Sequence, residues 1–322
     1  MRGTEMNTEY INMDKRELWE RDVVESIKLY NAWYMAYTHE VYKKTQKRIN
    51  QIVIKGVTDS KFFNDISPTM LKKSPSVLKI FRMITSPPLA RERLAGLAGV
   101  PLSFIKTMEN DNQLPTRLSQ QEVWKNLSKI IDVIQKMLDT DLIPWVADGR
   151  SPLEEERQLL VGIITERLSS GDTDSYLRNV QEQRQLAIIS KYLNAKGYKF
   201  SSTEKYNQMR SATYSYHTNI PVHDGIDVNI TVDVVIKPKN APVGEMPILI
   251  EAKSAGDFTN VNKRRKEEAK KMEQLRKTYG DDIKYYLFLG GYFNTNYLQY
   301  EASAGIDWIW EHRVSDLEKT GI

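Results

Sequence analysis

Cysteine is absent from the 322 residues of the chain. The protein therefore has no disulfide bonds and no cysteine-rich zinc site, which fits a reducing compartment. The sequence has no run of about 18 apolar residues, and residues 1–21 are too charged for a signal peptide. We therefore expect a soluble protein of the cytoplasm.

Motifs of several enzyme classes are also missing. The four histidines are His39, His217, His223 and His312. They show no metal-ligand spacing, which argues against a zinc site and against nucleases that gather histidines around a metal. The sequence has no glycine-rich phosphate loop and no nucleophile-elbow serine, so ATP-dependent chemistry and serine hydrolysis are not indicated. A net charge of +4 does not by itself indicate a nucleic-acid-binding protein.

The composition is that of a globular protein, with 40% hydrophobic and 27% charged residues. The length allows two domains. Helical patterns dominate residues 1–170, and two helices are expected at 153–168 and 174–196. The segment SSGDTD at 169–174 has the composition of a loop and marks the expected domain boundary, with the second domain at 171–322.

Two short apolar segments in the second domain carry unexpected charges. Val228–Ile236 and Pro247–Lys253 flank a loop rich in proline, which predicts two strands paired as a hairpin. Side chains alternate along a strand, so the valines and isoleucines at even positions of the first segment should share one face and Asp233 the other. Glu251 and Lys253 share one face of the second segment. Both segments are apolar enough to lie in a protein core, and burying a charged side chain there is costly unless it pairs with an opposite charge or binds a metal.

If the polar faces of the two strands coincide, Asp233 and Glu251 converge and Lys253 lies close by. Paired carboxylates bind a hard cation such as Mg²⁺, which removes their mutual repulsion. A lysine beside the cation can position or deprotonate water or stabilise charge on a phosphate. The alternative is a buried ion pair that only satisfies itself, and the pattern alone leaves both interpretations open.

The order Asp233, then Glu251-Ala252-Lys253 at the end of the next strand, resembles the signature of the PD-(D/E)xK nucleases. Val232 stands where that family often has proline. The chain more specifically resembles type II restriction endonucleases of the XamI type, in the segments 89–100, 251–271 and 305–318.

The resemblance implies Mg²⁺-dependent hydrolysis of double-stranded DNA at a short, palindromic site. It implies Mg²⁺ bound by Asp233, Glu251 and the carbonyl of Ala252, with Lys253 orienting or activating water. It further implies a homodimer that cuts both strands, and a cognate DNA methyltransferase as a separate protein. In this superfamily a helix before the first strand can add another acid, for which Glu182 is the candidate. The alternative for Glu182 is a surface pair with Arg178, one helical turn away.

A basic run follows the expected metal site. Residues 253–277 hold nine basic residues against four acidic ones, and they include a predicted helix at 259–279. Such a run is often only a solvated helix face, but its position favours contact with phosphates or base edges. The candidates for DNA contact are Asn260, Asn262, Lys263, Arg264 and Arg265.

The segment 76–110 predicts short helices joined by a tight turn at Gly99, as in a helix-turn-helix motif. Arg91, Arg93 and Lys106 could contact DNA there. The alternative is an ordinary helical corner in a domain that serves dimerisation or packing.

The expected fold class is α+β or α/β: an all-helical N-terminal domain followed by a nuclease core, a mixed sheet flanked by helices. Two other functions compete with restriction cleavage. One is a non-catalytic, sequence-specific DNA-binding protein, and the other is a structure-specific repair nuclease on the same fold. The intact trio Asp233, Glu251 and Lys253 argues against the first, while the target of cleavage does not follow from the trio.

Overall fold

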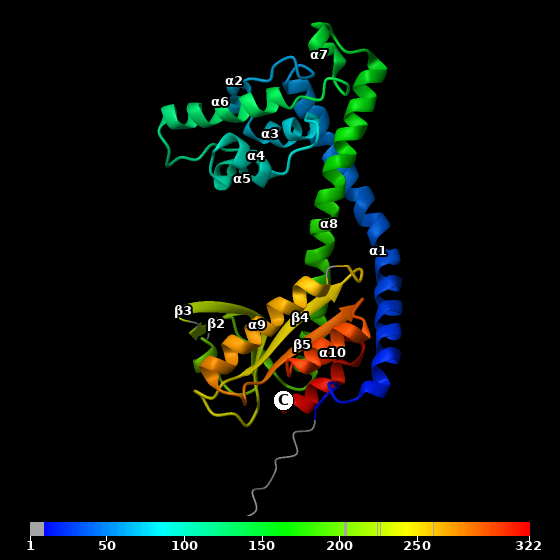
Figure 1. Cartoon of the computed structure of the whole chain (residues 1–322), viewed down its shortest axis with the longest axis vertical. Coiled ribbons are helices and arrows are strands. Elements are labelled where there is room, and N and C mark those ends of the chain that lie inside the picture. Colours follow the sequence, from blue (N-terminus) through cyan, green and yellow to red (C-terminus); the bar gives the residue numbers. More distant parts are fainter. Residues whose placement is uncertain (1–9, 203–204, 224, 226, 260) are drawn as a thin grey trace, which may run out of the picture. The chain divides into compact units, whose positions relative to one another are not determined.

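A computed structural model of the chain describes residues 10–202, 205–223, 225, 227–259 and 261–322 (Figure 1). Contacts divide the chain into two compact units. The sheet unit consists of the N-terminal segment to Tyr37 together with Leu177–Ile322, and the helical unit is Thr38–Tyr176. The sequence suggests one boundary near residue 170, whereas the contacts divide the chain at two points, each inside a long helix. In the described part of the chain, no helix is long and apolar enough to cross a membrane.

The helical unit is built around one apolar core, with Phe81, Phe104, Leu127 and Trp145 among its buried members. Its helices are α1 (Arg16–Asp59), α2 (Pro68–Lys73), α3 (Leu78–Phe81), α4 (Arg91–Ala98), α5 (Leu102–Asp111), α6 (Gln120–Lys136), α7 (Pro144–Asp148) and α8 (Glu154–Ala195), of which α1 and α8 belong partly to the sheet unit. Short 3-10 helices η1 (Pro75–Val77) and η2 (Arg82–Ile84) flank α3.

The predicted turn at Gly99 is present between α4 and α5. Gly99 has a φ of 60°, in the left-handed region that glycine adopts without steric cost. The backbone therefore forms the tight corner between short helices that the sequence predicts. Whether this corner contacts DNA is a separate question, considered with the site below.

The loop expected at residues 169–174 is wrong, because α8 continues through it to Ala195. Glycine and short polar residues cost a helix interior up to about 1 kcal/mol each. Packing and ion pairs offset that cost here. Ser169 and Thr173 are buried, and Asp172 accepts hydrogen bonds from Arg48 at 3.0 Å and Lys79 at 3.1 Å.

The sheet unit contains a six-stranded mixed sheet in the order β1-β2-β3-β4-β5-β6. The strands are β1 (Lys199–Phe200), β2 (Thr213–His223), β3 (Asp227–Lys237), β4 (Ile248–Ala255), β5 (Tyr285–Gly291) and β6 (Asp307–Trp310), and the short 3-10 helix η3 (Tyr206–Gln208) precedes β2. Strand β3 runs antiparallel to both of its neighbours, β2 and β4. The other pairs are parallel: β1 with β2, β4 with β5, and β5 with β6. The predicted hairpin is confirmed, with Val235 opposite Leu249.

Helices cover both faces of this sheet (Figure 1). One face packs against α9 (Val261–Tyr279), α10 (Thr295–Ser303) and the start of α1, and its buried residues include Leu249, Trp308 and Trp310. The other face packs against α8 and the 3-10 helix η4 (Glu311–Thr320). Both tryptophans are fully buried in this core.

The simple alternation expected along β3 is wrong. Ile230 and Val232 pack on the α9 face, whereas Val234 and Ile236 pack on the α8 face. The change of face occurs at Asp233, across from His217 of β2, whose φ is 47°. The pairs on either side of this position keep one register. The left-handed backbone of His217 in β2 therefore lies opposite the point where β3 departs from the regular alternation of faces, at Asp233.

Candidate active site

Asp233 lies at the irregular point of β3 and is largely buried, with 20% of its side chain exposed. Its Oδ2 accepts a hydrogen bond from the backbone N–H of Ala252 at 2.8 Å, which ties β3 to β4. Burial, and after it the charge of Glu251, raise the pKa of Asp233 to about 6. The two carboxylates expected to converge are therefore close enough to repel each other.

Glu251 lies on β4, and its side chain is 5% exposed. Its Oε1 accepts hydrogen bonds from the ammonium groups of Lys253, at 2.9 Å, and of Lys271 on α9. Its Oε2 is buried and has no hydrogen-bond partner in the described part of the chain. A buried carboxylate oxygen without a partner is costly, and a cation is the partner that would satisfy it.

Lys253 is held between two acids. Its Nζ lies 2.9 Å from Glu251 Oε1 and 2.9 Å from Oε1 of Glu268 on α9. Burial acts to lower the pKa of Lys253, but the charges of Glu268 and Glu251 outweigh it and raise the pKa above its ordinary value. Glu268 is also bound by the hydroxyl of Tyr285, which donates to Oε2. Two lysines and two glutamates thus form a buried, charge-balanced cluster beneath the expected cation.

Helix α8 is fixed to the same strands by Gln185, which is 2% exposed. Its Nε2 donates to the carbonyl of Lys253 at 3.1 Å and to that of Phe288 at 3.3 Å. Glu182 lies one turn earlier on α8, and its Oε1 is 3.6 Å from Nε2 of His217. Gln185 therefore positions the helix that carries Glu182, the further candidate acid of the site.

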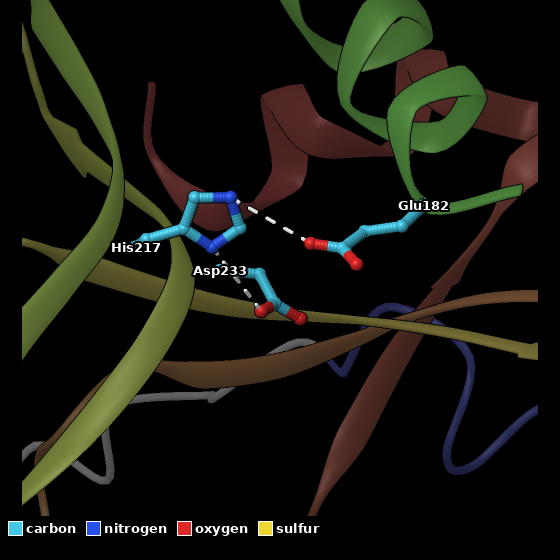
Figure 2. Close-up of side chains that lie close together, drawn as sticks. All are labelled: Glu182, His217 and Asp233. Carbon is cyan, nitrogen blue, oxygen red and sulfur yellow. Dashed lines mark ion pairs between the residues drawn. The ribbon is translucent and has the colours of Figure 1, made fainter. Parts of the chain in front are cut away.

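Figure 2 shows Glu182, His217 and Asp233 turned toward one another. One ligand atom from each residue lies within 4.8 Å of the other two. Glu182 adds to the repulsion that raises the pKa of Asp233. The sequence singled out Glu182 and Asp233 but not His217.

The residues present fit a divalent cation. Asp233, Glu251 and Glu182 supply carboxylate oxygens, the ligands preferred by Mg²⁺, and Glu251 Oε2 is buried without a hydrogen-bond partner among the described residues. The repulsion among the carboxylates would be relieved by bound positive charge. Glu251 and Lys253 also form the ion pair expected as the alternative, but this pair involves only Oε1 of Glu251.

Sequence reasoning missed four residues around the site: Gln185, His217, Glu268 and Lys271. For Glu268 a signal was present, because it shares a helix face with Met272 and Leu275, four and seven residues on, and both are buried. An acid on the apolar face of a helix indicates a buried partner. His217 gave no such signal, because its neighbours depend on the pairing of β2 with β3.

The predicted DNA-contacting residues near α9 cannot be placed. Asn260 lies outside the described residues, as do the side chains of Asn262, Lys263, Arg264 and Arg265. Their roles stay predictions.

In the helical unit, Arg91 bonds the buried carboxylate of Glu109 and, at 2.9 Å, Oδ1 of Asn110. Arg93 and Lys106 are exposed. Arg91 thus has a structural role, and the two exposed cations are the better placed for contact with DNA.

Two comparisons of the sequence with known proteins agree with each other. The model of the XamI restriction endonuclease family matches residues 61–310. The type II restriction enzyme SalI of Streptomyces albus G is 42% identical over 314 residues, covering 97% of this chain and 99% of that enzyme. Among solved structures, protein VC1899 from Vibrio cholerae is 15% identical with a TM-score of 0.26, covering 78% of this chain and 54% of its own. That structural likeness is too weak to indicate a shared fold.

Proposed function

Because the chain belongs to the XamI restriction endonuclease family, we propose that it hydrolyses phosphodiester bonds of double-stranded DNA at a short specific sequence, with Mg²⁺ as its cofactor. We propose further that its catalytic core is of the PD-(D/E)xK type, with Asp233, Glu251 and Lys253 as the signature residues. The mixed sheet flanked by helices is compatible with such a core.

One observation carries the proposal: Asp233 and Glu251 face each other from paired strands, while Oε2 of Glu251 is buried with no hydrogen-bond partner in the part of the chain that the structure describes. Asp233, Glu251 and the carbonyl of Ala252 would hold the cation. When bound, the cation would supply Lewis acidity to the scissile phosphate and its attacking water. The carboxylate of Asp233 is itself held in place by the hydrogen bond that it accepts from the backbone N–H of Ala252.

Lys253 has a separate role in the proposal. An ammonium group has three N–H donors; one donates to Glu251, and Oε1 of Glu268 lies 2.9 Å from Nζ as an ion-pair partner. In the proposal another N–H donates to the attacking water or to a phosphate oxygen, where developing negative charge is stabilised. Glu268 and Lys271 are positioning residues, because they act through Lys253 and Glu251.

Sequence selection must come from groups that reach base edges, since every phosphodiester offers the cation the same chemistry. We propose that Asn260, Asn262, Lys263, Arg264 and Arg265 contact the DNA, together with the corner between α4 and α5 through Arg93 and Lys106. A palindromic site cut in both strands is most simply served by a homodimer. A separate DNA methyltransferase would then protect the host's own copies of the site.

The test is digestion of a plasmid of known sequence by the full-length protein, with Mg²⁺ and with excess EDTA. Discrete fragments whose sequenced ends share one short motif, formed only with Mg²⁺, are expected. A smear would favour a nonspecific or structure-guided nuclease. Binding of DNA without cleavage under any divalent cation would instead identify a non-catalytic DNA-binding protein.

A further inference from the structure

We propose that Glu182 and His217, together with Asp233, form a second cation position beside the one at Asp233 and Glu251, and that its imidazole ligand favours Mn²⁺ and related transition ions over Mg²⁺. The inference rests on the proposed function only in using Asp233 as a shared ligand. The three side chains come from separate elements, α8, β2 and β3, and converge at one point (Figure 2).

The distances leave room for a cation among these groups. Nε2 of His217 lies 3.6 Å from Oε1 of Glu182, and Nδ1 lies 4.0 Å from Oδ1 of Asp233. Both distances exceed a hydrogen bond. Cation–ligand distances of about 2.0–2.2 Å place neighbouring ligand atoms about 3 Å apart. Small side-chain rotations would therefore close the three groups around one ion, with a single ring nitrogen as ligand.

Asp233 can serve two positions at once because its two oxygens face different partners. Oδ2 is bonded to the amide of Ala252 on the β4 side, and Oδ1 is the oxygen nearest His217. A bridging carboxylate of this kind suits paired cations about 3.5–4 Å apart.

Charge and exposure also favour a cation. Two carboxylates face one imidazole, so with both carboxylates ionised the cluster stays negative whichever form the ring takes. The side chains of Glu182 and His217 are 46% and 52% exposed, so an ion can enter from solvent without unfolding the strands. A purely structural ion pair would instead bring the ring within hydrogen-bond distance of one acid.

The ligand set determines which ion is preferred. Mg²⁺ favours sites made of oxygen ligands and water, whereas imidazole nitrogen suits the transition ions. We therefore expect Mn²⁺ to fill both positions and Mg²⁺ to fill chiefly the one at Asp233 and Glu251.

The experiment measures Mn²⁺ binding directly, without DNA, in the full-length untagged protein. Titration followed by electron paramagnetic resonance counts bound Mn²⁺, and the pulsed form of the method detects nitrogen coupled to it. The variants are His217→Asn, Glu182→Gln and Glu251→Gln. Asparagine suits position 217 because it tolerates a positive φ and lacks the imidazole. His39→Asn is the control, an exposed histidine of α1. Circular dichroism confirms that each variant is folded.

The wild type and His39→Asn should bind about two Mn²⁺ per chain with nitrogen coupling. His217→Asn should lose the coupling, and Glu182→Gln should weaken that position. Glu251→Gln should keep the coupling while losing the other ion. Absence of nitrogen coupling in the wild type, or its persistence in His217→Asn, would overturn the inference. A different outcome separates this inference from the proposed function. If Glu251→Gln binds as many Mn²⁺ ions as the wild type, and the nitrogen coupling is lost only in His217→Asn, the cation position proposed at Asp233 and Glu251 is contradicted while this inference stands.

Discussion

Replacing Glu268 with glutamine tests the buried charge cluster behind the site. The side chain of Glu268 is 1% exposed and lies 2.9 Å from Lys253 Nζ and 3.8 Å from Lys271 Nζ. In Glu268→Gln the shape is kept but both lysines must share the single carboxylate of Glu251. Breaking a buried ion pair costs about 3–5 kcal/mol, and a hydrogen bond to a charged group contributes about 1.5–3 kcal/mol.

The expected loss of stability is smaller than the full cost of breaking a buried ion pair. Glutamine still offers an acceptor oxygen, and Lys253 keeps its bond to Glu251. We therefore expect the sheet unit to lose about 2–3 kcal/mol of stability. At about 1.4 kcal/mol per tenfold change, the amides of β4 and β5 should exchange hydrogen about 30- to 150-fold faster.

Hydrogen exchange is the suitable assay because it reports on the sheet unit alone, whereas global unfolding of a chain with two units need not be two-state. Glu267→Gln is the matched control, the adjacent exposed acid on α9, and should change stability by less than about 0.5 kcal/mol. Exchange in Glu268→Gln within about threefold of wild type would refute the view that this cluster stabilises the sheet unit.

Three further predictions concern other ionisable residues. Arg91→Ala should lower the thermal midpoint, because Glu109 is left buried without one of its partners and such a loss costs about 1–3 kcal/mol. Arg93→Ala and Lys106→Ala should leave the thermal midpoint unchanged. If the α4–α5 corner contacts phosphates, each should weaken DNA binding and reduce the slope of log affinity against log salt concentration by about one. Unchanged binding would show that the corner has only a structural role. Burial lowers the pKa of His312 from 6.5, so the stability that this neutral ring contributes is fully present above pH 6.5 and is lost as the pH falls from there through the lowered pKa of the folded state. His312→Gln should therefore flatten the fall of the thermal midpoint between about pH 7.5 and 5, and an identical fall in the variant would contradict this assignment.

The sequence predicted those features that depend on local patterns. The hairpin of β3 and β4 follows from two short runs of valine and isoleucine bounded by prolines. The turn between α4 and α5 follows from Gly99, which adopts a positive φ without strain. The expected grouping of Asp233, Glu251 and Lys253 required only that the two polar faces meet.

Features that depend on distant contacts were not predictable. The continuity of α8 through Gly171 depends on Asp172 meeting Arg48 and Lys79, more than 90 residues away. The change of face at Asp233 and the approach of His217 depend on the register of β2 with β3. Local propensity carries no information about either, since both are decided by tertiary packing.

If Asp233 and Glu251 hold the cation that DNA cleavage requires, their removal should abolish cleavage and spare binding. Single-turnover cleavage of a duplex carrying the mapped site measures this for wild type, Asp233→Ala, Glu251→Ala and the exposed control Asp281→Ala, each with Mg²⁺ and with excess EDTA. The two site variants should lose at least about a hundredfold in rate while binding the duplex within about tenfold of wild type. EDTA should stop the wild type and the control. Cleavage by either site variant at a rate near that of wild type, or by wild type in excess EDTA, would contradict this role of the two carboxylates.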